Sequence, residues 1–593
     1  ISSNSTLHLA GGNLVVTGGA NENNIQTFDG VNITAGTNNI SATSGTSGSI
    51  TLNLGAVNRS GGLVDFDLPS NGFITTTSDA LGGWATVNNG SSYAKVDEEG
   101  RILAFTDSDY TIENNPTAWG EGQFISDDST GFNSPTSLDI PDGALQLGGL
   151  RYTAARSTTL TIAAGDTLGI DGAILVTPTV GAFNQTIDGG FLTGMAGGGT
   201  LGVQQNSAGR FFIGSQITDN GGAIGFTKSG SGEVVLSNTG NDYTGATIVT
   251  QGTLQVASIA NGGQASSIGA SSADSSNLVL EGAELRYIGG SVTTDRGFTL
   301  NRSGSIASST IGVATTGADL EFTGVVTGSE GAGLIKTGAG TLTLSNEANN
   351  YTGVTSVNVG TLSITTLANG GEASSIGASS SDASNLVLAG GGRLQYTGGS
   401  VVTDRGFRLS GGSGGVIEVA DANTTLTFGG TAEGVGSAPL RKEGAGTLVL
   451  AGTNTYTGTT TVSGGVLRAG SETAFGSASM MTLADTAGVA LDLAGFDNKV
   501  GALSGGGANG GNVLLGDATL TIGGANGTYS GVISGDGGVY KENGSTQTMV
   551  GCNHTYTGPT TIGVRRRDGE IAWGVFRAVP VSPDEGGRPD AVA

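Results

Sequence analysis

Two aspartate pairs are the residues of this sequence whose types and spacing could do chemistry. Asp65 and Asp67 alternate within a strand-like segment, so both side chains would lie on one face, whereas the adjacent Asp127 and Asp128 would not. Clustered carboxylates, sometimes with Ca²⁺ and an Arg or Lys base, are what a polysaccharide lyase or hydrolase on a β-helix needs. These four aspartates are therefore the candidate catalytic residues.

A second acidic pattern occurs twice. Asp295–Arg296 and Asp404–Arg405 occupy equivalent places in two similar segments, 289–300 and 398–409. Because the pattern is duplicated one unit apart, we interpret each as a structural ion pair or a solvated edge charge rather than an active site.

Other common chemistries lack the necessary residues. A serine triad needs a histidine base, and the only two histidines, His8 and His554, lie near opposite ends of the chain. The same separation excludes a His/Cys zinc cluster, and Cys552, the single cysteine, cannot form an intrachain disulfide. The sequence therefore predicts neither a metal site nor a cofactor.

The composition limits the class of protein. The 593 residues include 110 glycines, and 24 basic against 49 acidic residues give a net charge of −25. This balance argues against nucleic-acid binding, which needs a basic surface to displace counterions from phosphates. No run of eighteen apolar residues is present, so no membrane insertion is expected. Small and β-prone residues broken by Gly and Asn predict many short strands and tight turns.

The elements that must position these residues follow from a repeat. Four segments are alike, and their tyrosines Tyr243, Tyr351, Tyr456 and Tyr556 lie roughly a hundred residues apart. Repeated units stack on their neighbours rather than folding around one globular core. The four segments are 228–256, 336–364, 442–469 and 541–563.

Each unit contains a finer rhythm of short alternating strands. Residues 341–344, 353–357 and 361–364 alternate polar and apolar side chains, and turns of Asn, Ser and Gly separate them. Three such strands make one coil of a right-handed parallel β-helix, an all-β β-solenoid.

The same alternation names the residues that should form structural ladders. Apolar side chains at equivalent positions should stack inside the solenoid, asparagines should stack at the turns by amide bonding, and the tyrosines should pack over a corner. His554 holds the asparagine position in the last repeat. The ladder residues are Leu342, Leu344, Leu448, Leu450, Asn241, Asn349, Asn454, Tyr243, Tyr351, Tyr456 and Tyr556.

Three regions are expected along the chain. Residues 1–227 should form an N-terminal β-helix region, continuous in fold with the rest, with loop excursions or an insertion around 59–150, where any ligand site would lie. Residues 228–563 should form the repeat β-helix. Residues 564–593 contain the run Arg565–Arg567 and three prolines, and we expect this tail to be disordered, truncated or frame-shifted.

The repeat resembles the autotransporter passenger-associated β-strand repeat, whose pattern is K-x-G-x-G-T-L-x-L, an Asn-rich turn, Y-T-G-x-T and a G-x-L ending. Residues 228–256 and 336–364 fit it almost fully, 442–469 fit well, and 541–563 fit poorly in the first strand. The resemblance implies a secreted or outer-surface β-helical passenger of a Gram-negative-type bacterium, serving as an adhesin or a stalk. It supplies no catalytic residues.

The sequence differs from the resemblance in one respect. No series of amphipathic barrel strands follows residue 563, and no export signal precedes the first strand-like segment. Both are expected to lie outside this chain, unless the protein reaches the surface by another route.

The function expected is therefore a non-enzymatic adhesin or structural stalk or fibre on a bacterial surface. Its partners would be surface glycans, a host or neighbouring cell surface, or other copies of itself. Two alternatives stay open: a β-helical polysaccharide lyase or hydrolase, and a self-assembling sheath or filament protein.

Overall fold

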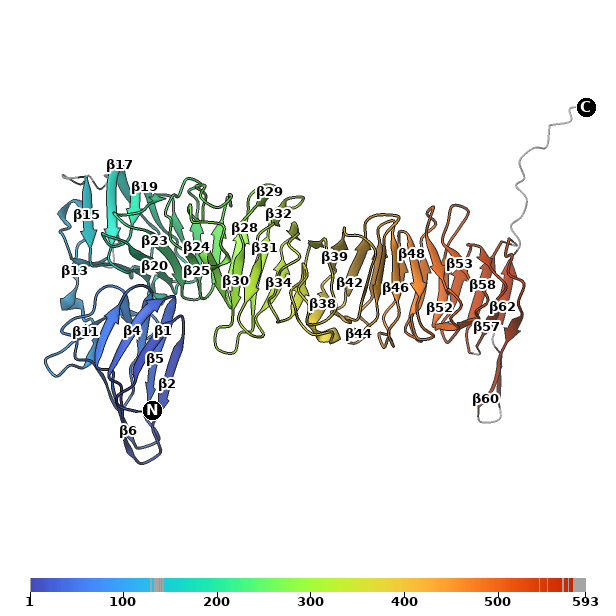
Figure 1. Cartoon of the computed structure of the whole chain (residues 1–593), viewed down its shortest axis with the longest axis horizontal. Coiled ribbons are helices and arrows are strands. Elements are labelled where there is room, and N and C mark those ends of the chain that lie inside the picture. Colours follow the sequence, from blue (N-terminus) through green and yellow to red (C-terminus); the bar gives the residue numbers. More distant parts are fainter. Residues whose placement is uncertain are drawn as a thin grey trace, which may run out of the picture. The chain divides into compact units, whose positions relative to one another are not determined.

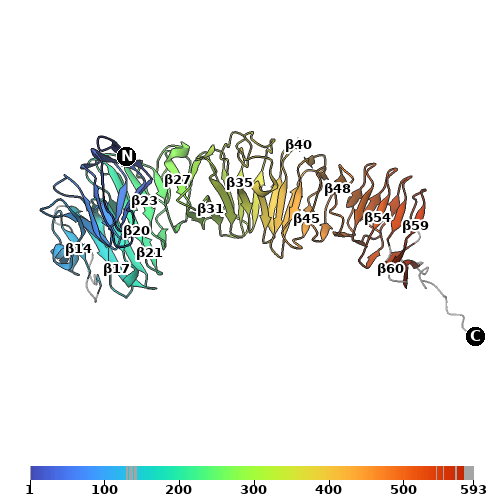
Figure 2. The ribbon, with the colours of Figure 1, turned by 90° about the horizontal axis from the view of Figure 1, so that it is seen from below.

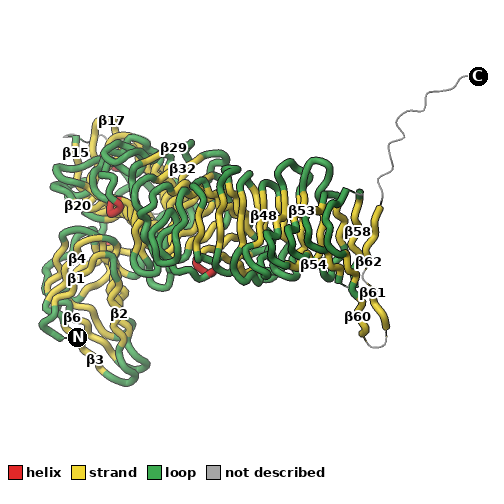
Figure 3. The backbone as a smooth tube through the Cα atoms, turned by 45° about the vertical axis from the view of Figure 1, so that its right-hand side comes forward, coloured by secondary structure: helices red, strands yellow, loops and turns green. Residues whose placement is uncertain are grey.

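The computed structural model describes residues 2–127, 131–132, 138, 140, 143–542, 544–551, 553–567, 570–573 and 575–579. The chain forms two compact units, Ile1–Leu334 and Ile335–Ala593. Strands and loops build both (Figure 3), and within the described residues the helical elements are short 3-10 turns. These turns are η1 (Asp107–Asp109), η2 (Pro116–Ala118), η3 (Pro178–Val180), η4 (Ser275–Asn277) and η5 (Ala383–Asn385).

Both units are parallel β-solenoids, as the alternation predicts. Each strand pairs in parallel with the equivalent strand of the next coil, and alternate side chains point into a buried core. Antiparallel pairs occur among the described strands only in two short hairpin regions, β10–β11–β12 and β60–β61.

The first unit begins with a small solenoid of three sheets, called here the N-terminal stack. Its core is a separate cluster that includes Ile33, Ile40, Ile50 and Phe66. One sheet holds β1 (Thr6–Ala10), β4 (Gly30–Ala35) and β7 (Ala56–Arg59), and another holds β3 (Asn23–Thr27), β6 (Ser49–Asn53) and β9 (Gly72–Thr75). The third holds β2 (Asn13–Thr17), β5 (Thr37–Thr43), β8 (Leu63–Asp67), β10 (Ala85–Val87), β11 (Ser92–Val96) and β12 (Ile102–Ala104).

The rest of the first unit is a second solenoid, called here the main stack. One sheet contains β13 (Thr111–Ile112), β14 (Phe124–Ser126), β16 (Gly149–Tyr152), β18 (Ala173–Val176), β20 (Gly199–Gln205), β23 (Ile224–Ser229), β25 (Thr247–Val249), β27 (Leu278–Glu281), β30 (Phe298–Asn301) and β33 (Val326–Gly328). A second contains β15 (Ala144–Leu147), β17 (Thr158–Ile170), β19 (Gln185–Thr193), β21 (Arg210–Ile213), β24 (Glu233–Leu236), β26 (Thr253–Val256), β28 (Glu284–Tyr287) and β31 (Ser308–Val313), with β22 (Gln216–Ile217) beside β19. A third face begins with β29 (Val292–Thr294) and β32 (Asp319–Phe322).

The N-terminal stack and the main stack lie side by side and run in opposite directions (Figure 1). The first coil of the N-terminal stack lies against a late coil of the main stack. Gly11 approaches Glu281 so closely that a Cβ added to Gly11 would stand 3.0 Å from a carboxylate oxygen. The next coil meets an earlier one through the hydroxyls of Thr37 and Thr250, 3.3 Å apart. The last coil meets β20 and β16, as the Thr86–Gln204 and Tyr93–Leu150 hydrogen bonds show.

This reversal differs from the single continuous winding expected over residues 1–227. The hairpins β10–β11–β12 end the N-terminal stack, and the chain then passes through η1 and starts the main stack at β13. Alternation within a strand has the same period whichever axis the coil winds around, so it cannot reveal a change of axis. The segment 85–126, within the expected insertion, makes this turn.

The second unit continues the repeat pattern in successive coils (Figure 2). The strand β34 (Gly333–Thr337) spans the unit boundary. One row of strands contains β35 (Thr341–Leu344), β37 (Thr361–Ile364), β39 (Gly392–Tyr396), β42 (Gly415–Val419), β45 (Leu440–Glu443), β47 (Thr460–Val462), β49 (Met480–Leu483), β52 (Ala502–Gly505), β55 (Gly527–Tyr529), β58 (Thr546–Val550) and β62 (Val575–Val579).

Three further rows complete the second unit. One contains β36 (Thr355–Val357), β38 (Leu386–Ala389), β41 (Phe407–Ser410) and β44 (Ala432–Gly434). Another contains β40 (Val401–Thr403), β43 (Thr425–Phe428), β46 (Thr447–Leu450), β48 (Val466–Ala469), β50 (Ala490–Asp492), β53 (Asn512–Leu514) and β56 (Ile533–Ser534). The last contains β51 (Asn498–Val500), β54 (Leu520–Ile522), β57 (Val539–Lys541) and β59 (Thr560–Ile562).

The structure differs from the expected disordered tail over part of its length. Strands β60 (Val564–Arg567) and β61 (Glu570–Trp573) form an antiparallel pair, and β62 adds in parallel to β58. An unpaired strand edge is a template for another strand, which explains why sequence without clear alternation can still pair there. Residues 580–593 lie outside the described residues.

Candidate functional site

Asp65 and Asp127 belong to separate networks, and the Asp65 carboxylate has three hydrogen-bond donors. Its carboxylate accepts hydrogen bonds from the Thr86 hydroxyl at 2.6 Å and from the amides of Asn89 and Gly90 at 2.7 and 2.8 Å. Burial raises the pKa of the Asp65 carboxyl, and these three donors oppose the rise. Asn88, Asn89 and Gly90 all have positive φ, so Asp65 stabilises a turn of unfavourable backbone conformation.

Asp67 lies on the same outward face of β8, as the alternation predicts. Its carboxylate accepts a hydrogen bond from the side-chain amide of Asn39 at 3.0 Å. Both Asp65 and Asp67 line a cavity of about 590 Å³ between the N-terminal stack and the main stack. This cavity, called here the inter-stack groove, is the candidate functional site.

Two rows of outward side chains face each other across the groove. Strand register places Asn13, Asn39, Asp65 and Thr86 in one row on the N-terminal stack. The main stack contributes the second row, one side chain per coil, at the ends of β20, β23, β25, β27 and β30. Its members are Gln204, Ser229, Thr250, Glu281 and Asn301.

Glu281 is the carboxylate that sequence reasoning missed. Its carboxyl group lines the groove and is nearly buried, and burial raises its pKa to about 7. Local sequence shows an acidic residue at a strand end, which is ordinarily exposed. The N-terminal stack, more than two hundred positions away in the sequence, lies against it, since Gly11 approaches the Glu281 carboxylate closely.

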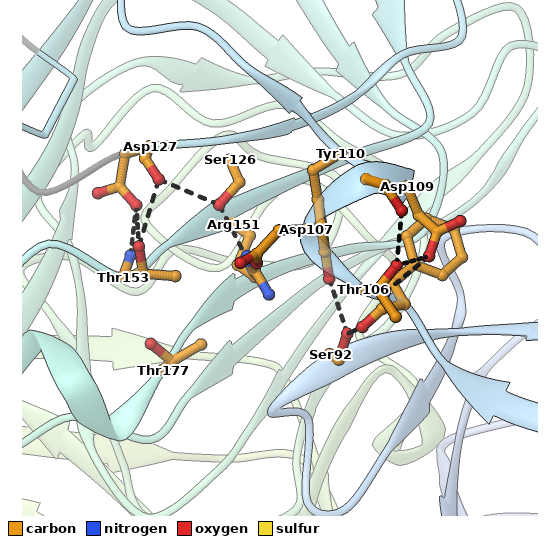
Figure 4. Close-up of polar contacts among 12 residues, drawn as sticks. Ser92, Thr106, Asp107, Asp109, Tyr110, Ser126, Asp127, Arg151, Thr153 and Thr177 are labelled. Carbon is orange, nitrogen blue, oxygen red and sulfur yellow. Dashed lines mark hydrogen bonds and ion pairs between the residues drawn. The ribbon is translucent and has the colours of Figure 1, made fainter.

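Asp127 belongs to a different network (Figure 4). Its carboxylate accepts hydrogen bonds from the amide and the hydroxyl of Thr153, both at 2.6 Å, and from the Ala154 amide at 3.1 Å. Burial raises the pKa of the Asp127 carboxyl. Asp128 lies outside the described residues, as does Cys552.

Arg151 joins this network to the segment where the chain reverses. Its guanidinium donates to the Ser126 hydroxyl at 3.0 Å, lies 3.7 Å from the centroid of the Tyr110 ring and approaches Asp107 at 3.6 Å. A cation over an aromatic face is stabilised further when it is desolvated. These bonds attach the reversal segment to the first coils of the main stack.

Tyr93 fastens the N-terminal stack to the main stack. It is fully buried, its hydroxyl donates to the Ala173 carbonyl at 2.6 Å, and it accepts from the Leu150 amide at 2.8 Å. Phe105 and Phe124 pack against its ring at centroid distances of 5.9 and 4.9 Å.

We expect Tyr93→Phe to loosen the contact between the stacks, because it leaves the buried Ala173 carbonyl and Leu150 amide without partners. The free energy of unfolding should fall by about 2 kcal/mol. Hydrogen exchange of residues 85–110 measures the loosening. Tyr287→Phe is the control, since it removes a similar bond, to the Gly290 carbonyl at 2.7 Å, within one stack. Equal exchange in the two variants would count against Tyr93 as the fastener.

The two Asp–Arg patterns are structural, but no salt bridge joins the partners among the described residues. Arg405 is buried, and its guanidinium donates to the Ala368 and Gly377 carbonyls and to the Ser379 hydroxyl at 2.8–3.1 Å. Arg296 makes the equivalent bonds one repeat earlier. The adjacent Asp404 instead accepts from the Gly370 amide at 2.7 Å. Together they hold the long loops that leave the solenoid in these two repeats.

The apolar ladder residues lie in the core. Leu342 and Leu344 are opposite Leu362 and Ile364 in neighbouring coils, and all four are fully buried. Leu448 and Leu450 stand in the same relation to the two inward residues of β48, Leu467 and Ala469.

The ladder asparagines bond to backbone in adjacent coils rather than to one another. Asn454 accepts from the Ala432 amide at 2.6 Å and donates to the Ala474 carbonyl at 2.7 Å. Asn241 bridges Ile217 and Ser267 in the same way, at 2.9 and 3.0 Å, and Asn349 donates to the Ser375 carbonyl at 3.1 Å. Equivalent asparagines are several coils apart and do not stack on one another, and Asn241 and Asn454 each tie three successive coils together.

The repeat tyrosines each bond a threonine four residues later, which explains the Y-T-G-x-T pattern. The hydroxyl pairs are Tyr243–Thr247, Tyr351–Thr355, Tyr456–Thr460 and Tyr556–Thr560, at 2.7, 2.7, 3.2 and 2.5 Å. The first three tyrosines are fully buried, and burial raises the pKa of Tyr456 to about 12.

The lysine that begins each repeat is a structural residue that sequence reasoning overlooked. Lys442 is fully buried, and its ammonium donates to the Glu443, Gly444 and Gly464 carbonyls at 2.7, 2.9 and 3.0 Å. Lys228 and Lys336 make equivalent sets of three carbonyl bonds. Burial lowers the pKa of Lys228 to about 7 and those of Lys336 and Lys442 to about 8.

His554 replaces the ladder asparagine in the last repeat. Its Nδ1 accepts from the Ile533 amide at 3.2 Å, its ring stacks near Tyr529, and burial lowers its pKa. Protonation would put a donor against the Ile533 amide. A folded pKa below the unfolded value near 6.5 means that the stabilisation is present above about pH 6.5 and is lost as the pH falls through the lower, folded value.

We therefore expect the coil around β59 to have lower protection factors, which correct for the intrinsic pH dependence of amide exchange, at pH 5 than at pH 7.5. His554→Asn should remove this difference, because asparagine does not titrate. Persistence of the same pH dependence in the variant would show that another group causes it.

Neither a cluster of metal-binding side chains nor a membrane-spanning helix is found within the described residues. They contain no group of three or more His, Cys, Asp or Glu side chains placed to hold a metal ion. No helix within them has the length and apolar character needed to cross a membrane.

Comparison with known proteins agrees with the repeat architecture. The passenger-associated-transport-repeat model matches residues 226–256, 334–364, 440–469 and 540–563. The chain is 52% identical, over 563 residues, to the adhesin BmaC autotransporter of Brucella suis biovar 1 (strain 1330). That alignment covers 95% of this chain but 16% of the relative, so the chain spans a small part of that protein's length. No solved structure matches the chain at a significant level. The chain is thus a parallel β-solenoid that carries four passenger-associated-transport-repeats and is similar, over nearly its whole length, to a segment of an adhesin autotransporter.

Proposed function

We propose that this chain is a segment of a cell-surface adhesin passenger. In this role the repeat solenoid is a structural support, and the paired stacks of residues 1–334 carry the recognition surface. The observation that supports the proposal most is the similarity over 95% of the chain to a protein named as an adhesin autotransporter.

The hydrogen bonds of the recurring polar residues support a structural role for the repeats. The lysine, asparagine and tyrosine positions that recur all bond within the solenoid, so they are not available to a ligand. Recognition then falls to a surface outside the repeat consensus, and the inter-stack groove, with a volume of about 590 Å³, is such a surface.

A non-enzymatic role is also part of this proposal. Asp65 and Asp127 each have three hydrogen-bond donors on the carboxylate, an arrangement suited to holding backbone rather than to proton transfer. One observation favours a polysaccharide-active enzyme instead, namely that Asp65, Asp67 and Glu281 line one cavity.

The test is to display the full chain on a non-adherent bacterium and to count the cells that bind to cultured epithelium. The carrier without the chain is the control, and purified chain is added as competitor. Binding that the competitor suppresses supports the adhesin. No gain in binding at equal surface density, together with new reducing or unsaturated ends in a polysaccharide, would replace it with the enzyme.

A further inference from the structure

We propose that the inter-stack groove binds a neutral, hydroxyl-rich chain, that is, a short oligosaccharide. This inference names the ligand class for the adhesin function proposed above and rests on it.

The groove has the size and position of a ligand site. Its volume of about 590 Å³ falls within the range of roughly 300–1,000 Å³ that is usual for such sites, and sites occur preferentially where two bodies meet. Neighbouring coils are about 4.8 Å apart, so the four side chains of the main-stack row that line the cavity, Gln204, Ser229, Thr250 and Glu281, extend over roughly 14 Å. An elongated ligand could therefore meet a new polar group at each coil.

The lining is suited to hydroxyl groups. Amides from Asn13, Asn39 and Gln251 offer both donors and acceptors, and hydroxyls and carboxylates add further acceptors. Ile306 is the one large apolar side chain among the lining residues. A ligand that binds by burying apolar surface would find little to contact here.

The charge of the groove excludes polyanions. Arg302 is the one cationic side chain in the lining, against the carboxyl groups of Asp65, Asp67 and Glu281. Sulfated glycans and nucleic acids would meet repulsion, because their recognition depends on clustered Arg and Lys.

The state of the carboxyl groups favours a neutral ligand over a cationic one. Three donors already occupy Asp65, and the Asn39 amide donates to Asp67. Burial raises the pKa of Glu281 to about 7, so near neutral pH it carries only part of a charge. These donors compete with an ammonium group for the same oxygen atoms, whereas the amides of the lining offer a neutral ligand both donors and acceptors.

The groove is held in shape before any ligand arrives. The Thr86 and Thr37 hydroxyls bond to Gln204 and Thr250 between the two stacks at 3.3 Å, and the bond of Tyr93 to the Ala173 carbonyl also fastens the stacks together. A preformed site loses less conformational freedom on binding, which favours affinity.

The experiment measures binding of the full chain to an array of neutral, amine-bearing and sulfated oligosaccharides. The groove variant is the double substitution Asn13→Ala and Gln251→Ala, both at exposed side chains that line the cavity. The matched control is Asn23→Ala with Gln255→Ala, which changes the same residue types outside the cavity. A third variant, Glu281→Gln, removes the charge and keeps the hydrogen-bonding groups.

We expect binding to one or more neutral oligosaccharides, weakened about tenfold or more in the groove variant by the loss of hydrogen bonds. The control should bind as the unmodified chain does, and Glu281→Gln should retain most of the affinity. Equal binding by groove variant and control would overturn the groove as the site. Binding confined to sulfated or amine-bearing probes, or binding abolished by Glu281→Gln, would overturn the neutral ligand. Adhesion to epithelium without binding to any oligosaccharide would overturn this inference and leave the adhesin function standing, whereas absence of both would remove the adhesin function as well.

Discussion

Replacing Arg405 with alanine should release the loop at 365–380 and lower the free energy of unfolding by about 3 kcal/mol. The guanidinium is buried and bonds to the Ala368 and Gly377 carbonyls and the Ser379 hydroxyl, so its removal leaves several polar groups without partners and opens a space. Limited proteolysis within 365–380 and chemical denaturation of the full chain measure the two effects.

Arg408→Ala is the matched control for this prediction. Arg408 lies three residues later, is more than a third exposed in its side chain, and bonds to Glu433 on the surface. Surface ion pairs contribute little, so this variant should lose less than about 1 kcal/mol. If both variants were cleaved at the same rate, Arg405 would not be the residue that holds the loop.

Replacing Lys442 with methionine should destabilise its coil by about 2–3 kcal/mol. Methionine keeps the apolar stem of the side chain but cannot donate to the Glu443, Gly444 and Gly464 carbonyls. Part of the loss is offset because a buried cation is no longer desolvated, which limits the size of the effect. Hydrogen exchange should be faster in β45 and β47 than elsewhere in the second unit.

The neighbouring Arg441→Met controls for the loss of one positive charge. Arg441 is largely exposed and pairs with Glu443 on the outer face. Its substitution should leave exchange in β47 unchanged. Comparable exchange in the two variants would mean that net charge, and not the bonds of the Lys442 ammonium to the three carbonyls, stabilises this corner.

Much of the fold could be predicted from the local alternation of polar and apolar residues. Leu342 and Leu344 could be placed inside from sequence because period two puts alternate side chains on one face, whatever the neighbouring coils contain. Lys442 could also have been found, since a chain with only 24 basic residues places one at the start of every repeat. The burial of this lysine was not predicted because lysine is rarely buried in proteins.

The inter-stack groove could not be derived in this way. Gln204 and Glu281 occupy outward positions, and a period-two pattern assigns outward residues to solvent. Their burial depends on the N-terminal stack folding back alongside the main stack, a long-range arrangement that no local period encodes. For the same reason the sequence did not show that Asp65, a candidate residue of the enzyme alternative, is a buried support for the turn at 88–90.

The sets of three carbonyl bonds around Lys228, Lys336 and Lys442, called here lysine cages, have a consequence for how such proteins change length. The ammonium groups of Lys228, Lys336 and Lys442 bond only to carbonyls at their own corners and in the following coil, so each of these cages is complete without any other copy of the repeat. Gain or loss of one unit by recombination would therefore leave every remaining corner satisfied. Evolution can adjust the reach of the molecule in whole increments without redesigning its interior.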